Sequence, residues 1–335
     1  MEALELAAKI LREGGLVALP TETVYGLGAN ALDAAAVAQI FKAKQRPSWD
    51  PVIVHIAGME MLDGLVLEAS ERARRLMEAF WPGPLTMLLP RTAAVPDAVT
   101  AGRPLVGVRM PSHPVALELI RRAGVPIAAP SANRFARISP TTAEHVLHDL
   151  DGRIDAVLDA GPAQRGVEST VIDPAPNPMI IYRPGAVTIE QIRKVAGPAE
   201  FYKEGKRLAR AARETPQEAL PAPGVGLRHY APKARLVLIG APKRHLDARL
   251  AEAARERRDE ILGVMLPEGI ATPPGIAPGG VFAWGRWESP EELAQRLYAG
   301  LRALDAAGCT VILCPLPPAE GLGDALRDRL RKAAR

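Results

Sequence analysis

The sequence predicts two α/β domains joined by an extended linker. Short apolar runs typical of strands alternate with helical patterns through the first 200 residues, and the alternation resumes at residue 235. The segment between them is basic at first and then rich in proline, alanine and glycine. With 335 residues, 48% of them hydrophobic, the chain can bury two cores. We therefore expect a larger domain over 1–200, a linker over 201–234 and a smaller domain over 235–335.

Residue patterns and helix signals place the individual elements. The first helix, over residues 1–13, is amphipathic and ends at a glycine pair. Further helices are expected over 33–44, 70–80, 114–124, 141–150, 289–308 and 323–335. Strands are expected over 15–20, 51–58, 84–90, 105–110, 125–130, 155–161, 169–176, 179–185, 235–240, 260–267 and 310–317.

Composition excludes several classes of protein. No apolar run approaches the roughly 20 residues that a membrane span needs, and the N-terminus does not resemble a signal peptide. Cys309 and Cys314 fall on opposite faces of a predicted strand, so neither a disulfide nor a metal pair is expected between them. These features predict a soluble, cytoplasmic protein. The net charge of +4 suits a protein that handles phosphates or RNA, and it is also the ordinary result of an arginine-rich composition.

A basic pair ends one predicted helix. Lys44 and Arg46 precede Pro47, which ends the helix, and the following strand runs to His55. Cations in a last helical turn commonly complement the helix dipole, which is the structural explanation. Because they lead directly into the strand, the two cations and the imidazole can also line one cleft.

Small polar residues and further cations follow other predicted strands. Ser131 and Asn133 lie beside two arginines, a set suited to phosphate oxygens, and Ser139 or Thr141 is expected to cap the next helix. Arg109 ends an apolar strand and needs an anionic partner if it is buried, from the protein or from a ligand. The remaining polar residues at strand ends are Ser169, Thr170 and Arg183.

No nucleophile–base triad, dinucleotide-binding glycine motif or P-loop occurs in the chain. The pattern therefore indicates an anion-binding α/β enzyme that works by positioning and charge neutralisation.

Six segments together resemble the threonylcarbamoyl-AMP synthase family, which has the YrdC-like fold. They read LPTETVYGLGANA, KQRP…DPVIVHI, FWPGPLTMLL, VGVRMPSHP, PSAN…SPT and GVESTVID…YRPGAV, and they occur in the family's order. The linker, RHYAPKA and the second domain are similar to the long, two-domain form. The resemblance implies a twisted mixed sheet with helices in the first domain and a Rossmann-like second domain.

The resemblance also implies a reaction. L-threonine captures bicarbonate as its N-carboxy derivative, which attacks the α-phosphorus of ATP, giving threonylcarbamoyl-AMP and pyrophosphate by nucleotidyl transfer. Mg²⁺ is implied as the companion of ATP, with no ligand assigned from protein side chains. A downstream tRNA threonylcarbamoyl transferase complex would use the product to modify the adenosine next to the anticodon. Direct tRNA binding is left open.

Residue roles follow from the match to the family's motifs. Lys44, Arg46, Ser131 and Asn133 match the catalytic tetrad around the nucleotide phosphates. The expected threonine-side residues are Thr23, His55, Arg109 and Ser169, with Arg109 binding the substrate carboxylate. The tetrad, Asp50, Ser139, Arg183, His229 and Tyr230 are expected at ATP. Within TETVYG, Thr21 and Glu22 are expected to turn away from the site, since strand neighbours alternate faces.

Two departures from the family pattern qualify this assignment. Position 50 is Asp where the family has Asn, and an acid beside phosphate requires a cation, Mg²⁺ or a ribose hydroxyl. The linker reads PAPGVGLRHYAP, without the more basic residues expected before HYAP, so His229 and Tyr230 can equally belong to a solvent-facing tether. The linker glycines Gly224 and Gly226 also fit a lid that excludes water from the intermediate.

Two alternatives stay open at this point. The basic linker residues could contact RNA, although aromatic residues make up only 4% of the chain. These residues are Lys203, Lys206, Arg207, Arg210 and Arg213. A related carbamoyl-transferring enzyme is the other alternative, but the zinc-finger and acylphosphatase-like segments expected there are not visible.

Overall fold

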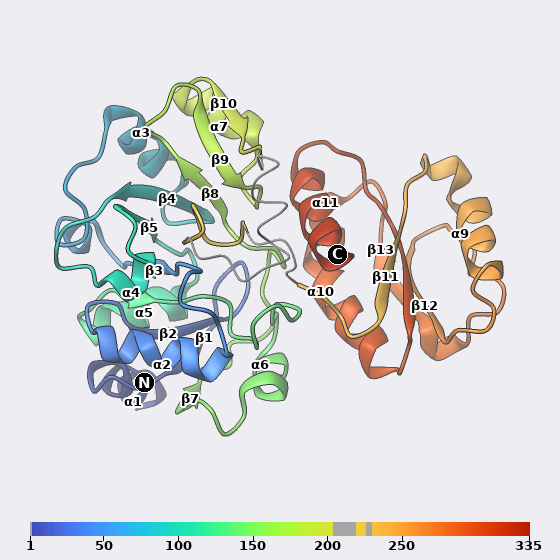
Figure 1. Cartoon of the computed structure of the whole chain (residues 1–335), viewed down its shortest axis with the longest axis horizontal. Coiled ribbons are helices and arrows are strands. Elements are labelled where there is room, and N and C mark those ends of the chain that lie inside the picture. The colour runs from blue at the N-terminus through green and yellow to red at the C-terminus, as the bar shows by residue number, and fades with distance from the viewer. Residues whose placement is uncertain (1, 204–218, 226–229) are drawn as a thin grey trace. The chain divides into compact units, whose positions relative to one another are not determined.

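The structure is a computed structural model that describes residues 2–203, 219–225 and 230–335 (Figure 1). The described chain divides into two compact units. The first holds most of 2–203 together with 219–225, and the second holds 230–335 together with Ala136–Ile138 and Arg165–Val167. Among the predicted site and lid residues, Gly226 and His229 lie outside the described residues. All of 204–218 also lies outside them, and this stretch holds every basic linker residue named above except Lys203.

The predicted fold class is confirmed, because each unit combines a β-sheet with packed helices. The helical elements of the first unit are α1 (Glu2–Arg12), α2 (Ala34–Lys44), η1 (Met59–Met61), α3 (Glu71–Phe80), α4 (Asp97–Thr100), α5 (Pro114–Ala123), α6 (Ala143–Leu150) and α7 (Ile189–Ala196). Its strands are β1 (Val17–Leu19), β2 (Gly26–Asn30), β3 (Ile53–His55), β4 (Leu85–Pro90), β5 (Leu105–Arg109), β6 (Ile127–Ala128), β7 (Ala156–Val157), β8 (Thr170–Asp173), β9 (Met179–Arg183) and β10 (Ala199–Phe201).

The described strands of the first unit form one mixed sheet in the order β10-β9-β8-β4-β5-β3-β6-β2-β1-β7. β3 runs parallel to β5, which pairs antiparallel with β4, and β4 runs parallel to β8. Strands that are distant in sequence are therefore neighbours at the centre of the sheet.

Alternating side chains give this sheet a core on each face. On β1, Val17 and Leu19 join a cluster with α1 and α5, while Ala18 between them joins the larger cluster beneath α2 and α3. β6 divides in the same way, with Ile127 in the first cluster and Ala128 in the second. Helices that cover both faces explain why the strand sequences are almost continuously apolar.

Helix caps show one difference from the sequence prediction. Asp33 and Ser70 cap α2 and α3, accepting bonds from the first backbone N–H groups. The cap of α6, however, is Thr142, whose hydroxyl accepts from the N–H of His145. The prediction that Ser139 or Thr141 caps this helix is wrong, because the helix begins at Ala143, two residues later than the pattern indicates.

The second unit is a smaller parallel sheet covered on both faces. Its elements are β11 (Arg235–Ile239), η2 (Lys243–His245), α9 (Leu246–Arg255), β12 (Leu262–Pro267), η3 (Pro278–Gly280), β13 (Val281–Gly285), α10 (Pro290–Ala306), β14 (Val311–Pro315) and α11 (Leu322–Ala333). The strand order is β11-β14-β12-β13, and all pairs are parallel. Figure 1 shows α10 and α11 on one side of this sheet and α9 on the other.

Two further expectations from the sequence concern the two cysteines and membrane-spanning helices. Cys309 and Cys314 are both buried free thiols. In the described residues, no helix combines the length and apolar character needed to cross a membrane.

Gly185 gives a test of the packing between β8 and β9. A Cβ atom there would lie 2.3 Å from the backbone nitrogen of Thr170 and 2.5 Å from the carbonyl oxygen of Glu168. Because both are backbone atoms, Gly185→Ala should lower the free energy of unfolding by about 1–3 kcal/mol in urea denaturation. Gly64→Ala is the control, since its nearest neighbour is 3.9 Å away. Equal stabilities of the two variants would contradict this prediction.

Candidate active site

The predicted threonine-side residues converge on one face of the central strands. His55 on β3 is the register partner of Arg109 on β5, so their side chains leave the sheet on the same face. Ser169 precedes β8, and its hydroxyl is 2.8 Å from that of Thr86 on β4. The structure therefore brings these residues together from four strands that lie side by side.

Arg109 is almost fully buried and held by three groups. Its Nε donates to the carbonyl of Gly83 at 3.2 Å, and its Nη1 donates to the hydroxyl of Thr23 at 3.0 Å. Its Nη2 donates to Oε1 of Glu22 at 2.5 Å, which makes a buried ion pair. The sequence left open whether a protein or a ligand carboxylate meets Arg109, and the structure provides Glu22.

This contact corrects the expectation that Thr21 and Glu22 turn away from the site. Residues 20–25 form bends between β1 and β2, so the alternation of a strand does not apply to them. The Thr21 hydroxyl donates to the carbonyl of Val24 at 2.6 Å and lies 2.8 Å from the Thr23 hydroxyl. Thr21, Glu22 and Thr23 are all at most 2% exposed.

His55 is held in its neutral form. Burial is the main reason that its pKa falls to about 3, and the positive charge of Arg109 lowers the pKa further. Its Nδ1 atom is buried and has no hydrogen-bond partner in the part of the chain that the structure describes. The neutral imidazole can therefore form a hydrogen bond with a ligand without adding a positive charge to the site.

Ser169 connects the threonine-side residues to Arg183. The Nη2 of Arg183 donates to the Ser169 hydroxyl at 3.0 Å, and its Nε donates to the Ser169 carbonyl at 3.0 Å. Burial is the main cause of the pKa shifts of His55 and Asp50, and the charge of Arg183 is a smaller influence on both. Thr86 was not predicted from the sequence; it resembles any threonine on a buried strand.

Lys44 and the Ser131–Asn133 segment form a second cluster. The Lys44 ammonium group donates to the carbonyls of Ser131 and Asn133, each at 2.5 Å. Burial, reinforced by the nearby charge of Arg46, holds the pKa of Lys44 well below its ordinary value. Lys44 ends α2, so the helix terminus does position it, but its contacts are with a distant loop.

Arg46 and Asp50 form a buried ion pair in which Nη2 and Oδ1 are 2.9 Å apart. Arg46 also donates from Nη2 to the carbonyl of Pro51 at 2.8 Å. Burial raises the pKa of Asp50, opposed by the charges of Arg46, Lys44 and Arg183. The acid at position 50 thus meets a cation, and its predicted place at ATP stays a prediction.

Other residues predicted at ATP have protein contacts of their own. The Ser139 hydroxyl donates to Oε1 of Glu168 at 2.6 Å. Tyr230 belongs to the second unit, where its ring stacks on Tyr298 with centroids 5.8 Å apart and the Arg329 guanidinium lies 5.1 Å from it. An ATP contact from Ser139 or Tyr230 stays a prediction.

The described part of the linker packs on the site face of the sheet. Ala222 and Val225 are buried in a cluster with Ile53, Leu88 and Val171. These three lie two residues from His55, Thr86 and Ser169 respectively, so they share the face of those residues. Residues 219–225 are therefore a packed cover over the first unit's sheet.

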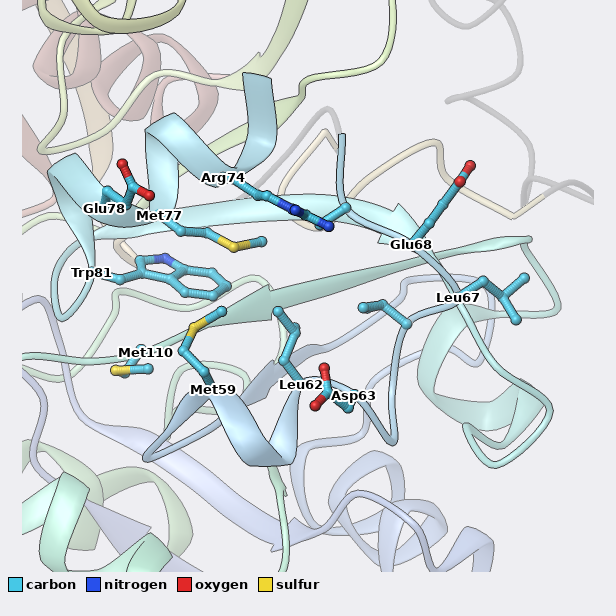
Figure 2. A pocket seen from close by; sticks show the side chains of 12 residues that line it. Met59, Leu62, Asp63, Leu67, Glu68, Arg74, Met77, Glu78, Trp81 and Met110 are labelled. Carbon is cyan, nitrogen blue, oxygen red and sulfur yellow. The ribbon is translucent and has the colours of Figure 1, made fainter. Parts of the chain in front are cut away.

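A separate cavity of about 690 Å³ is lined by residues that include Trp81 and Met110 (Figure 2). Figure 2 shows the Trp81 ring between Met77 and Met59, with Met110 alongside. Met110 follows Arg109 in the chain, and its carbonyl accepts a 2.7 Å bond from the N–H of Gly83, whose own carbonyl accepts from Arg109. The cavity contains none of the predicted site residues, yet Gly83 links its wall to the site.

Comparison with known proteins identifies the family. A family model described as telomere recombination matches residues 9–185, and one described as threonylcarbamoyl-AMP synthase, C-terminal domain, matches residues 187–335. The threonylcarbamoyl-AMP synthase of Pyrococcus abyssi is 42% identical over 339 residues, which cover 99% of this chain and 94% of the relative. This chain belongs to the threonylcarbamoyl-AMP synthase family.

Other members of the family match over the same length. The threonylcarbamoyl-AMP synthase of Bacillus subtilis is 44% identical, covering 98% of this chain and 92% of its own. The crystal structure of Pyrococcus abyssi Sua5 complexed with L-threonine superposes with a TM-score of 0.87 at 42% identity, covering 99% of this chain and 94% of that one. The likeness to this threonylcarbamoyl-AMP synthase family fold therefore includes both units.

The low pKa of His55 gives a stability prediction. As the pH falls from about 6.5 towards 3, the unfolded chain binds a proton at this residue and the native chain does not, so the native state loses about 1.4 kcal/mol per pH unit. The variant His55→Gln lacks this loss. Urea denaturation should show that its stability relative to the natural chain rises by about 2 kcal/mol between pH 7 and pH 5. A difference that does not change with pH would contradict the neutral, buried state of His55.

Proposed function

We propose that this chain is an L-threonylcarbamoyladenylate synthase that converts L-threonine, bicarbonate and ATP into threonylcarbamoyl-AMP and pyrophosphate. The observation that carries the proposal is the single buried face on which Arg109, neutral His55 and Ser169 lie beside Arg183. The full-length likeness to relatives named for this product supports it.

Arg109 is suited to the carboxylate of threonine. Its three described partners use one N–H on each guanidinium nitrogen. One N–H on each terminal nitrogen is then left within the described contacts, and each can donate to an oxygen of a carboxylate. Neutral His55 supplies a hydrogen-bonding group for the threonine hydroxyl without repelling the neighbouring guanidinium.

Lys44 and Arg46 of the second cluster, together with Arg183 beside Ser169, are suited to ATP. Lys44, Arg46 and Arg183 can neutralise the triphosphate and the pyrophosphate that leaves, and Mg²⁺ enters as part of the ATP substrate. Among the described residues, no group of three or more His, Cys, Asp or Glu side chains is placed to hold a metal. The chain's contribution is to hold the carbamate oxygen in line with the α-phosphorus.

The cover formed by residues 219–225 is suited to protect the intermediate. An N-carboxy amino acid and a mixed anhydride both react with water, and a packed apolar segment over the site face limits the entry of water. We assign the product to a downstream tRNA threonylcarbamoyl transferase complex in the cytoplasm, with no requirement that this chain bind tRNA itself.

Pyrophosphate release tests the reaction. The purified chain with ATP, Mg²⁺ and bicarbonate should release pyrophosphate only when L-threonine is added, and Arg46→Ala should reduce the rate by at least about tenfold because a phosphate-binding cation is lost. Arg121→Ala, at a side chain that is 57% exposed, is the control and should match the natural chain. ATP hydrolysis that does not depend on threonine, or the absence of pyrophosphate release, would reject the proposed reaction and favour the RNA-binding alternative.

The cover can be tested with one substitution. Ala222→Glu places a charge in the apolar contact with Ile53 and Val171, so the segment should detach while the sheet stays folded. We expect threonine-dependent product yield to fall at least about fivefold, with more ATP consumed per product formed. Ala219→Glu, at a half-buried position three residues earlier, is the matched control. Unchanged yield in Ala222→Glu would show that the cover has no part in the reaction.

A further inference from the structure

Glu22 has a carboxylate oxygen without a partner beside the arginine assigned to the substrate. The residue is 2% exposed, and its Oε1 accepts from Arg109. Its Oε2 is buried and has no hydrogen-bond partner among the residues described. Buried carboxylate oxygens are normally hydrogen-bonded, so a missing partner at this place indicates a ligand.

The loop is built to keep Glu22 in this position. The Thr21 hydroxyl accepts from the N–H groups of Thr23 at 3.2 Å and Val24 at 3.3 Å, which fixes the turn around Glu22. Arg109 is held independently by Gly83 and Thr23. Glu22 therefore has a fixed orientation, and it is not the sole support of the guanidinium.

The chemistry of an α-amino acid matches this arrangement. Its carboxylate and its ammonium group are attached to one carbon atom, so a carboxylate held by Arg109 brings the ammonium group to the residues flanking the guanidinium. Of these, the Thr23 hydroxyl is bonded to Arg109 and Thr21, and the Ser169 hydroxyl is bonded to Thr86 and Arg183.

Two buried polar atoms without described partners then flank Arg109, namely Oε2 of Glu22 and Nδ1 of His55. The imidazole is neutral and offers no charge to a cation. An ammonium ion is bound best by an anion, since charge-assisted hydrogen bonds are the stronger ones.

We propose that Glu22 binds the α-ammonium group of the threonine substrate through Oε2 while Arg109 binds its carboxylate. This proposal rests on the proposed function. The positive Arg109 and the negative Glu22 then face the two opposite charges of a zwitterion. This arrangement selects α-amino acids over hydroxy acids, which have no ammonium group. It also fixes the position of the nitrogen, which must give up a proton and become a neutral amine before it can react with bicarbonate.

A thermodynamic cycle tests the proposal. Isothermal titration calorimetry on the full chain compares two ligands, each with the natural chain and with one variant. The probes are L-threonine and (R)-3-hydroxybutanoate, which is threonine without its amine. In Glu22→Gln, threonine should bind at least about tenfold more weakly because the anionic acceptor is lost. The affinity for (R)-3-hydroxybutanoate should change by less than about threefold, because Arg109 stays in place.

The outcomes separate recognition from a merely structural role. Equal losses for both ligands in Glu22→Gln would show that Glu22 acts only by supporting Arg109, and would overturn the proposal. A natural chain that binds both ligands equally would overturn it as well. If Glu22→Gln does not fold, Glu22→Asp keeps the charge and must keep the preference for threonine. A chain that shows the expected cycle but releases no pyrophosphate would retain this proposal and reject the proposed reaction.

Discussion

Burial of positive charge on one face of a mixed sheet is the constraint on which the first unit depends. Lys44, Arg46, Arg109 and Arg183 are 1%, 8%, 3% and 6% exposed. A cation this deeply buried is tolerated only when anions or several hydrogen-bond acceptors surround it. Two of the four meet carboxylates, one meets two backbone carbonyls, and Arg183 meets Ser169.

These partners come from loops between the regular elements, and this explains the polar residues found there. The bend at 20–25 supplies Glu22 and Thr23, and the segment after β6 supplies the carbonyls of Ser131 and Asn133. Strand ends position Arg109 and Arg183, while Lys44 and Arg46 lie at the end of α2, and together they contribute positive charge to the site. Protein carboxylates offset that charge only in part, which leaves it able to attract anionic ligands.

The sequence was sufficient for most of the elements, although the strands β2, β10 and β13 and the short helix α4 were not predicted. Arginines at the ends of apolar runs and a basic pair at a helix end are local features, and each lies where it was expected. The contacts of Glu22 were not predictable. Side chains alternate between faces only in a strand, and residues 20–25 form an irregular loop. The helices α7 and α9 were missed, and in α9 alanine provides much of the apolar face, so its periodicity is weak. The packing of Ala222 and Val225 depends on distant strands, which a proline-rich linker pattern does not reveal.

Gly83 connects the wall of the cavity in the first unit to the side chain of Arg109 through its two backbone hydrogen bonds. Its N–H is bonded to Met110 in the wall of the cavity, and its carbonyl is bonded to Arg109. A molecule bound against Trp81 that displaced the Met110 carbonyl would move Gly83 and so change the support of the guanidinium. Thermodynamic linkage makes such an effect reciprocal, so a carboxylate bound at Arg109 would alter the affinity of the cavity to the same degree. An inhibitor of this kind would need to resemble neither an amino acid nor a nucleotide.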